Sequence, residues 1–293
     1  MKPISFFLLA LFGISMASCG GLLQVSEEDE APEIENSRPK LVIGIVVDQM
    51  RYDYLTRYWE DYSEDGFKRL MTGFVAHDHH FSYAPTYTGP GHASVYTGTT
   101  PSVHGIISND WFNGLQDSSV YCTEDLTVKG VGTESAAGQM SPRRMLASTM
   151  CDELKLFSNG RSKTIGVSLK DRGAILPAGH SANGAYWFVG GEEGQWVTST
   201  FYGDALPDWV KAFNLRNMGK EMLKEGWKRF KEEAVYDESL ADNNPYEKAF
   251  VGGERPTFPY DLQALALQNG NFDILKATPH GNKLTVEFAR AAI

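Results

Sequence analysis

The chain has 293 residues and a formal net charge of −10, from 27 lysines and arginines against 37 acidic residues. Hydrophobic residues make up 42 % and aromatic residues 12 %, which is too much core material for an intrinsically disordered chain. A net acidic chain without a long basic run argues against a nucleic-acid partner, because binding phosphate backbones needs a basic surface. Three cysteines are too few for a disulfide scaffold. Composition therefore leaves an acidic globular protein whose chemistry must be sought in its motifs.

The first segment is typical of an export signal. Residues 1–18 combine a positive start at Lys2 with an apolar stretch from Ile4 to Ala17 and small residues before Cys19. The stretch is shorter than the roughly 20 residues that a membrane-spanning helix needs. A cysteine at the cleavage point resembles a bacterial lipoprotein signal, in which Cys19 becomes the acylated N-terminus. The alternative is an ordinary signal peptide. Both predict export to the periplasm or cell envelope, with membrane attachment only through a lipid on Cys19.

The rest of the chain divides into a tether and one domain. Residues 19–40 are acidic and lack an apolar period, which indicates a solvated tether. The domain then spans 41–293, with an accessory excursion at about 179–279. Cys122 and Cys151 fall in this domain, and the sequence leaves open whether they pair or remain separate thiols.

Strand and helix patterns alternate along the domain. In the first part they predict a buried strand at 41–47, a helix at 52–71 in two pieces broken near Ser63, a strand start at 81–84 and a short helix at 92–97 ended by Gly98. A helix capped by Ser141 and ending near Asn159 follows, and then a strand at 164–169. The last part is predicted to hold a hairpin of 185–188 and 196–201, mostly helix over 207–268, and a helix from Asn282. This order predicts an α/β fold with a mostly parallel sheet flanked by helices. The last helical pattern reaches Ile293 without a capping signal, so we expect the sequence to be part of a longer one.

Two candidate site residues follow predicted strands or begin helices. Asp48 comes directly after the apolar run 41–47, at the strand end where functional groups gather in open α/β sheets. It is either a metal ligand or the cap of the next helix. Thr88 lies where the short helix begins, and the free N–H groups there favour an anion. Its hydroxyl could attack phosphorus if a metal or base activates it, or it could serve only as an N-cap.

Three further residues have polar side chains suited to a phosphoryl group. Asn109 could donate to a phosphoryl oxygen, or make an Asx turn. Lys170 and Arg172 directly follow the strand 164–169, and both could face an oxyanion; the alternative is a solvated loop. The cluster at 77–80, His-Asp-His-His, is a further metal candidate, but strand alternation would divide it between two faces.

Three segments in this order resemble the alkaline phosphatase superfamily: LVIGIVVDQMRYDYL, FSYAPTYTGPGHASVYTGTTPSVHGIISNDWF and IGVSLKDRGAILPAGH. Within it, the chain is similar to the phosphate-irrepressible bacterial alkaline phosphatases, the branch with a threonine nucleophile. The resemblance runs from about Leu41 to Ile293. It implies an alkaline-phosphatase-like α/β fold, with an inserted hairpin and helices, whose carboxyl-terminal part is absent from this sequence.

The resemblance implies a two-zinc phosphomonoesterase that acts on small phosphate monoesters through a phosphothreonine. By match of motif, Asp48 is a zinc ligand, and Thr88 is both the nucleophile and a ligand of the same zinc. Asn109 is implied as a donor to the phosphoryl oxygens. Lys170 and Arg172 are implied as the cationic pair that stabilises the phosphoryl group. This agrees with in-line displacement, in which two metal ions activate the attacking oxygen and neutralise the leaving one.

The sequence also departs from that family. Its further zinc ligands, in a D-x-x-x-H motif, an Asp-His pair and a distant histidine, correspond to positions beyond Ile293. Catalytic zinc needs about three protein ligands, so we expect weak zinc binding and slow turnover or none from this chain. A phosphodiesterase or nucleotide pyrophosphatase of the same superfamily is the nearest alternative, although Lys170-x-Arg172 favours monoesters. A non-catalytic phosphate-binding relic is the other.

Overall fold

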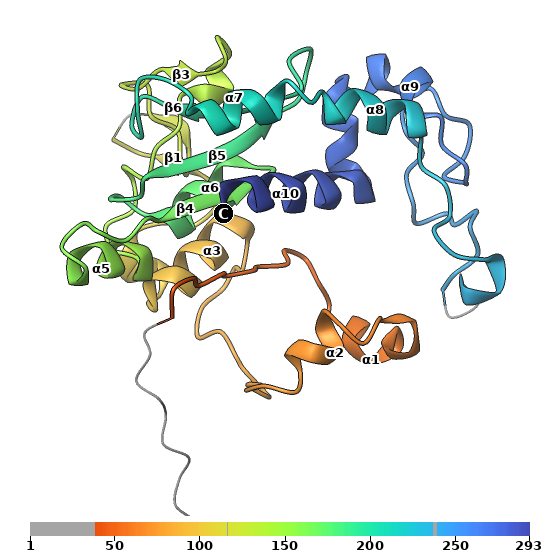
Figure 1. The fold of residues 1–293 in the computed structure, drawn as a ribbon, viewed down its shortest axis with the longest axis horizontal. Coiled ribbons are helices and arrows are strands. Elements are labelled where there is room, and N and C mark those ends of the chain that lie inside the picture. The colour runs from red at the N-terminus through yellow and green to blue at the C-terminus, as the bar shows by residue number, and fades with distance from the viewer. Residues whose placement is uncertain (1–38, 116, 237–238) are drawn as a thin grey trace, which may run out of the picture. The chain divides into compact units, whose positions relative to one another are not determined.

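The structure is a computed structural model that describes residues 39–115, 117–236 and 239–293 (Figure 1). The predicted signal peptide 1–18, Cys19 and nearly all of the tether lie outside the described residues. The chain divides after Ile45 into two units, and every helix and strand given below lies in the second unit, Val46–Ile293. None of the described helices has both the length and the apolar character of a membrane-spanning segment.

Helices make up most of the regular structure. The α-helices are α1 (Tyr54–Arg57), α2 (Phe67–Leu70), α3 (Thr88–Thr97), α4 (Pro101–His104), α5 (Met150–Phe157), α6 (Asp171–Ala178), α7 (Asp208–Asn214), α8 (Met218–Glu225), α9 (Leu262–Leu265) and α10 (Pro279–Ala292). The short 3-10 helices are η1 (Trp59–Asp61), η2 (Ala136–Gly138), η3 (Glu233–Tyr236), η4 (Ala266–Asn269) and η5 (Phe272–Ala277). The predicted two-piece helix at 52–71 is only partly present, as the single helical turns α1 and α2 with η1 between them. The predicted final helix is confirmed, although it begins at Pro279 rather than at Asn282.

A four-stranded sheet has the order β3 (Gly130–Val131), β6 (Gln195–Ser199), β5 (Gly184–Val189), β4 (Ile165–Ser168). The α/β class, the strand at 164–169 and the hairpin are confirmed. The predicted mostly parallel pairing is not seen among the described strands: β4 and β5 are parallel, whereas β6 is antiparallel to both of its neighbours. The reason is that the hairpin, predicted to lie in the excursion, belongs to the sheet itself, and strands joined by a tight turn must be antiparallel.

The apolar run at 41–47 is not a buried strand, contrary to the prediction. It belongs to no described strand, and its side chains are exposed, with 56 % of Leu41 and 76 % of Ile45 accessible to solvent. A strand exists only through ladder hydrogen bonds to a neighbour, and no described strand pairs with this run. The predicted strand start at 81–84 is wrong for the same reason.

Two helix predictions also need correction. The segment after Ser141 is irregular, and α5 begins at Met150 because Thr149 and Asp152 form a reciprocal capping box. Ser141 instead donates its hydroxyl to Asp125. The span 207–268 is only partly helical, because most of the chain between α8 and α9 is turn and irregular structure.

The core lies on both faces of the sheet, and strand β5 shows why. Side chains alternate along a strand, so Tyr186 and Phe188 pack in one cluster with residues of α7 and α10, including Phe288. Ala185 and Trp187 pack in another cluster with residues of α6. In Figure 1, α6 and α10 lie beside β4 and β5. The sheet thus fixes where α6 begins, which matters for the site.

Helix α6 lies unusually close to β4 because glycine lines the contact. A Cβ atom on Gly166 of β4 would come within 2.2 Å of the carbonyl oxygen of Ala174 in α6. A Cβ atom on Gly173 would come within 2.5 Å of the Ser168 hydroxyl. Neither helix nor strand can carry a side chain at these points without moving apart.

We predict that Gly166→Ala lowers the free energy of unfolding by more than about 2 kcal/mol, because the added methyl group overpacks a rigid backbone contact. Gly203→Ala is the matched control, since a Cβ atom there meets nothing within 4 Å. Urea unfolding of the two variants and the unchanged chain would measure both effects. Equal stability of the two variants would contradict this account.

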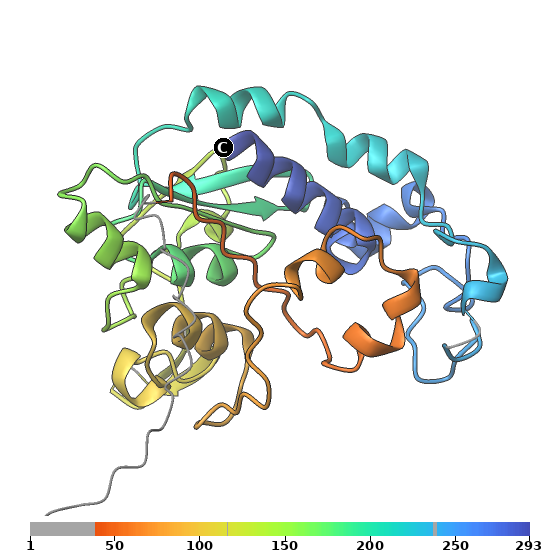
Figure 2. The same cartoon turned by 60° about the horizontal axis from the view of Figure 1, so that its bottom comes forward.

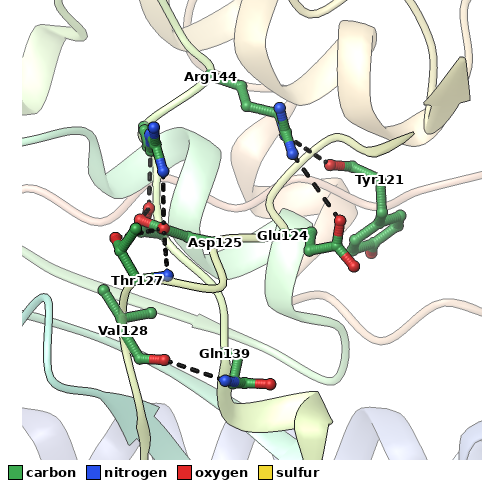
Figure 3. Close-up of polar contacts among 9 residues, drawn as sticks. Tyr121, Glu124, Asp125, Thr127, Val128, Gln139 and Arg144 are labelled. Carbon is green, nitrogen blue, oxygen red and sulfur yellow. Dashed lines mark hydrogen bonds and ion pairs between the residues drawn. The ribbon is translucent and has the colours of Figure 1, made fainter. Parts of the chain in front are cut away.

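A buried carboxylate, Asp125, organises the loops that follow β2 (Ser118–Tyr121) (Figure 3). Figure 2 shows the whole fold turned by 60° from the view of Figure 1. The backbone amide and the hydroxyl of Thr127 donate to Oδ1 at 3.0 and 2.6 Å, and the Ser141 hydroxyl donates to Oδ2 at 2.7 Å. Arg143 Nη1 lies 3.2 Å from Oδ1. Burial alone would raise the pKa of Asp125, but these hydrogen bonds outweigh it and lower the pKa to about 2.

We predict that this carboxylate stabilises the fold by about 2 kcal/mol at neutral pH. Because its folded pKa lies below the unfolded value, the contribution is complete above about pH 5 and declines as pH falls towards 2. Asp125→Asn should therefore lower the free energy of unfolding, measured in urea, more at pH 7 than at pH 3. Asp208→Asn, which alters an exposed carboxylate, should change little. An equal loss for Asp125→Asn at both pH values would disprove this account.

Candidate active site

Thr88 is the first residue of helix α3, and its side chain contacts the carboxylate of Asp48. The N-cap is Tyr87, and Thr88 is the first helical residue, with no side-chain capping bond at this terminus. Its hydroxyl donates to Asp48 Oδ2 at 2.9 Å. The alternative that Thr88 serves only as an N-cap is therefore wrong. The helix ends at Gly98, as predicted, in a left-handed conformation with φ +67°.

Asp48 lies in an exposed turn directly after the apolar run. It does not cap the next helix, because the N-cap of α1 is Asp53. The Asp48 carboxylate and the Thr88 hydroxyl are hard oxygen donors that suit a divalent cation. If Thr88 lost its proton, two anionic oxygens would lie side by side and repel each other, so a nearby cation would favour that state.

These two residues fit part of a ligand set for a metal. Among the residues that the structure describes, no group of three or more His, Cys, Asp or Glu side chains is arranged to hold an ion. The cluster at 77–80 is exposed irregular chain, and His79 instead contacts the ring of Phe81. The metal prediction for that cluster therefore has no support in the described structure.

Asn109 is anchored to the residue after Thr88. Its Oδ1 accepts the backbone N–H of Gly89 at 2.8 Å, which supplies an acceptor at the α3 N-terminus. With the oxygen fixed there, the Nδ2 donors point elsewhere. A Cβ atom on Gly89 would lie 3.2 Å from Asn109 Oδ1, so glycine lets the amide approach. The bond spans 20 residues and is not an Asx turn.

Arg172 and Lys170 differ in their surroundings at the start of α6. Lys170 is the N-cap residue and is exposed. Arg172 Nη1 donates to the Tyr121 hydroxyl at 2.7 Å, and that hydroxyl donates to Asp171 Oδ1 at 3.0 Å. Arg172 Nε is buried without a hydrogen-bond partner in the described structure. The solvated-loop alternative therefore suits Lys170 but not Arg172.

The β1–β2 hairpin joins the two parts of the site. In it, β1 (Asp110–Asn113) pairs with β2, and Asp110 lies opposite Tyr121. The backbone N–H of Cys122 donates to the Asn109 carbonyl at 2.9 Å. The strand pairing thus connects the residue that holds Gly89 to the residue that holds Arg172.

Contact between α3 and α6 also joins these parts. His92 Nδ1 is 2.8 Å from the Thr88 carbonyl oxygen, and its Nε2 faces Gly173 of α6. Hydrogen bonds therefore connect Thr88, Asp48, Asn109 and Arg172 in one network. Among the described residues, the Lys170 ammonium makes no hydrogen bond or ion pair to this network.

Both cysteines of the domain are free thiols. Cys122 is buried beside the site, and desolvation together with the charge of Asp171 raises its pKa to about 12. Cys151 is half-buried in α5, and burial raises its pKa as well. The question of pairing, which the sequence leaves open, is answered by two separate thiols.

Sequence reasoning missed Tyr121 and gave no role to Asp171. Burial raises the pKa of Asp171, although the hydrogen bonds from Thr123 and Tyr121 oppose the shift. The one signal for Asp171 was its place between two candidate cations. A tyrosine at the end of a short strand carries no comparable signal, because its role depends on a partner 51 residues away.

The model of the type I phosphodiesterase/nucleotide pyrophosphatase family matches residues 42–262, and the chain belongs to this family. Among its relatives, the chain is 49 % identical to a protein of Myroides odoratus named calcium-transporting ATPase, over 87 % of this chain and 46 % of the relative. It is 46 % identical to alkaline phosphatase PhoV of Synechococcus elongatus, over 88 % of this chain and 46 % of the relative. It is 44 % identical to alkaline phosphatase PafA of Elizabethkingia meningoseptica, over 97 % of this chain and 50 % of the relative. The chain spans about half the length of these relatives.

Solved structures agree with this assignment. The crystal structure of wild-type PafA aligns with a TM-score of 0.84 at 46 % identity, over 88 % of this chain and 49 % of that one. A PafA variant aligns with a TM-score of 0.83, at 44 % identity, over 88 % and 50 %. That variant has a threonine changed to serine, and an asparagine, a lysine and an arginine changed to alanine. The resemblance to the alkaline phosphatase superfamily and the α/β fold are thereby confirmed.

We predict that Asn109→Ala destabilises the chain by about 1 kcal/mol, because the Gly89 N–H loses its acceptor at a helix N-terminus. Asn109→Asp keeps an acceptor at that place and should retain most of the stability. Thermal or urea unfolding of both variants would measure the difference. If the two variants were equally destabilised, the Gly89 contact would not be the source of the effect.

Proposed function

We propose that this chain carries the phosphoryl-transfer half of an enzyme that hydrolyses phosphate monoesters through a phosphothreonine at Thr88. The hydrogen bond from the Thr88 hydroxyl to Asp48, at the N-terminus of α3, is the observation that carries the proposal. It places a nucleophilic oxygen next to a carboxylate, at the positive end of the α3 dipole. Such a helix end attracts a phosphoryl dianion.

Each proposed residue has a distinct task. Asp48 orients the Thr88 hydroxyl, so that its oxygen faces incoming phosphorus. Asn109, held by Gly89, directs its Nδ2 donors to a phosphoryl oxygen. Arg172 and Lys170 supply positive charge to the transferring group, which carries more negative charge in a monoester than in a diester.

Metal ions complete this proposal. Two zinc ions, when bound, would make the attacking hydroxyl more acidic and neutralise the leaving oxygen. Asp48 and Thr88 would hold one of them, which fits the adjacent oxygen donors described above. Zinc removal should therefore abolish any hydrolysis by this chain.

The PafA variant supports the choice of residues. The threonine and asparagine changed in it are 21 residues apart, as are Thr88 and Asn109. The lysine and arginine changed in it are two residues apart, as are Lys170 and Arg172. The same residue types therefore recur with the same spacing in a relative named as an alkaline phosphatase.

Phosphodiester or nucleotide pyrophosphate hydrolysis is the second candidate, and the family description favours it. The paired cations at 170 and 172 and the alkaline phosphatase relatives favour monoesters. The ratio of hydrolysis rates for p-nitrophenyl phosphate and bis-p-nitrophenyl phosphate distinguishes the two. If the chain binds phosphate but forms no phosphothreonine at Thr88, the non-catalytic alternative is favoured.

We also propose that the protein is exported by residues 1–18 and anchored by a lipid on Cys19, with 19–40 as a tether. The domain would then extend over 41–293. These assignments are supported by the sequence pattern. Metabolic labelling with a radioactive fatty acid, compared between the full chain and Cys19→Ala, would test the anchor.

We predict that Thr88→Ala abolishes the slow zinc-dependent hydrolysis of p-nitrophenyl phosphate that this chain can have, because the attacking oxygen is gone. Thr97→Ala, in the same helix, should keep the activity. Mass spectrometry of acid-quenched protein should show one added phosphoryl group on the Thr88 peptide, absent from Thr88→Ala. Unchanged turnover in Thr88→Ala would sink the proposed mechanism.

A further inference from the structure

The Tyr121 hydroxyl lies between an acid and a base that the sequence places side by side. It donates to Asp171 Oδ1 at 3.0 Å and accepts from Arg172 Nη1 at 2.7 Å. The guanidinium carbon of Arg172 also lies 5.7 Å from the centre of the Tyr121 ring. Asp171 and Arg172 therefore interact through a tyrosine of another element.

The direction of these bonds is fixed by chemistry. A guanidinium only donates hydrogen bonds, so the Tyr121 oxygen accepts from Arg172. The Tyr121 proton is then directed to Asp171, whose oxygen accepts it. Thr123 also donates its hydroxyl to the other oxygen of Asp171, so the carboxylate itself is held in place.

Tyr121 is fixed through its backbone as well. Arg144 Nε donates to the Tyr121 carbonyl at 3.0 Å, as Figure 3 shows. Strand pairing also places Tyr121 opposite Asp110, the residue that follows Asn109. These backbone contacts hold Tyr121 in place, so its hydroxyl is a fixed partner for the Arg172 guanidinium.

Tethering one end of the guanidinium leaves a defined edge for a ligand. Nη1 is occupied by Tyr121, whereas Nε is buried and has no partner among the described residues. Nε and Nη2 share one edge of the planar group, and that edge matches two oxygens of a phosphoryl group. An unpaired buried N–H is costly unless an acceptor arrives.

From this geometry we infer that Tyr121, held by Asp171, is a positioning residue that aims the Nε–Nη2 edge of Arg172 at the phosphoryl group. The inference rests on the proposed function. It assigns the tyrosine no contact with the substrate. Its effect passes entirely through the arginine, so removing the tyrosine hydroxyl matters only while Arg172 is present.

Phosphate binding in a double-mutant cycle tests this. Inorganic phosphate would be titrated calorimetrically, with zinc present, into the unchanged chain, Tyr121→Phe, Arg172→Ala and the double variant. Tyr121→Phe keeps the ring and should weaken binding about five- to tenfold. In the Arg172→Ala background the same change should have an effect of less than about twofold. Tyr62→Phe removes a hydroxyl that donates to a backbone carbonyl and serves as the matched control.

A second measurement does not depend on binding. The Nε–H resonance of Arg172, assigned by its loss in Arg172→Ala, should exchange slowly with water in the unchanged chain and in Tyr62→Phe. It should broaden or vanish in Tyr121→Phe. An unchanged resonance, or equal weakening of phosphate binding in both backgrounds, would overturn the positioning role. If the resonance responds as expected while even the unchanged chain fails to bind phosphate, Tyr121 still orients the Arg172 guanidinium, and it is the proposed function that fails.

Discussion

The hydrogen bond between Thr88 and Asp48 is the contact on which the functional interpretation depends. It joins positions 40 residues apart, one at the start of α3 and the other in a turn after an apolar run. A hydroxyl at such a place is acidic enough to react only if a neighbour favours its anion. The remaining features either hold α3 in place or would supply positive charge beside the phosphoryl group that the Thr88 oxygen attacks in the proposed reaction.

The scaffold behind this contact owes its precision to close backbone packing. Gly89 admits the Asn109 amide, and the absence of side chains at Gly166 and Gly173 brings α6 against β4. Each contact fixes the position of one candidate site residue. Asn109 is held beside α3, and Arg172 lies in the first turn of α6. Placing the site on element termini, supported by packed glycines, allows charged side chains to be rigid without being deeply buried.

The sequence could predict what local patterns decide. The strand at β4, the β5–β6 hairpin and the end of α3 at Gly98 follow from apolar runs and glycine signals, and the structure contains all three. It could not predict that the run 41–47 would lie outside the described sheet, because strand formation depends on a partner. The start of α5 at Met150 was missed because Thr149 forms the capping box with Asp152, whereas the Ser141 hydroxyl is bound to Asp125, a contact that local sequence does not reveal.

The candidate site shows the same division. Thr88, Asn109 and Arg172 could be singled out as candidates because their side chains suit a phosphoryl group and because their segments resemble one family. The structure connects them through hydrogen bonds, while their roles stay proposals. The hydrogen bond from Tyr121 to Asp171 was invisible, since it joins residues 50 apart and rests on the pairing of two short strands. As metal ligands the sequence offered only Asp48 and Thr88, and that role stays a proposal.

One neighbour of the site has a chemical consequence of its own. Cys122 sits against Gly89 and close to Asp171, and its pKa of about 12 keeps it protonated at neutral and moderately alkaline pH. Peroxide and alkylating reagents attack the thiolate form. A sulfur atom at the centre of the network is therefore shielded from oxidants by its own protonation and burial, without needing a disulfide partner.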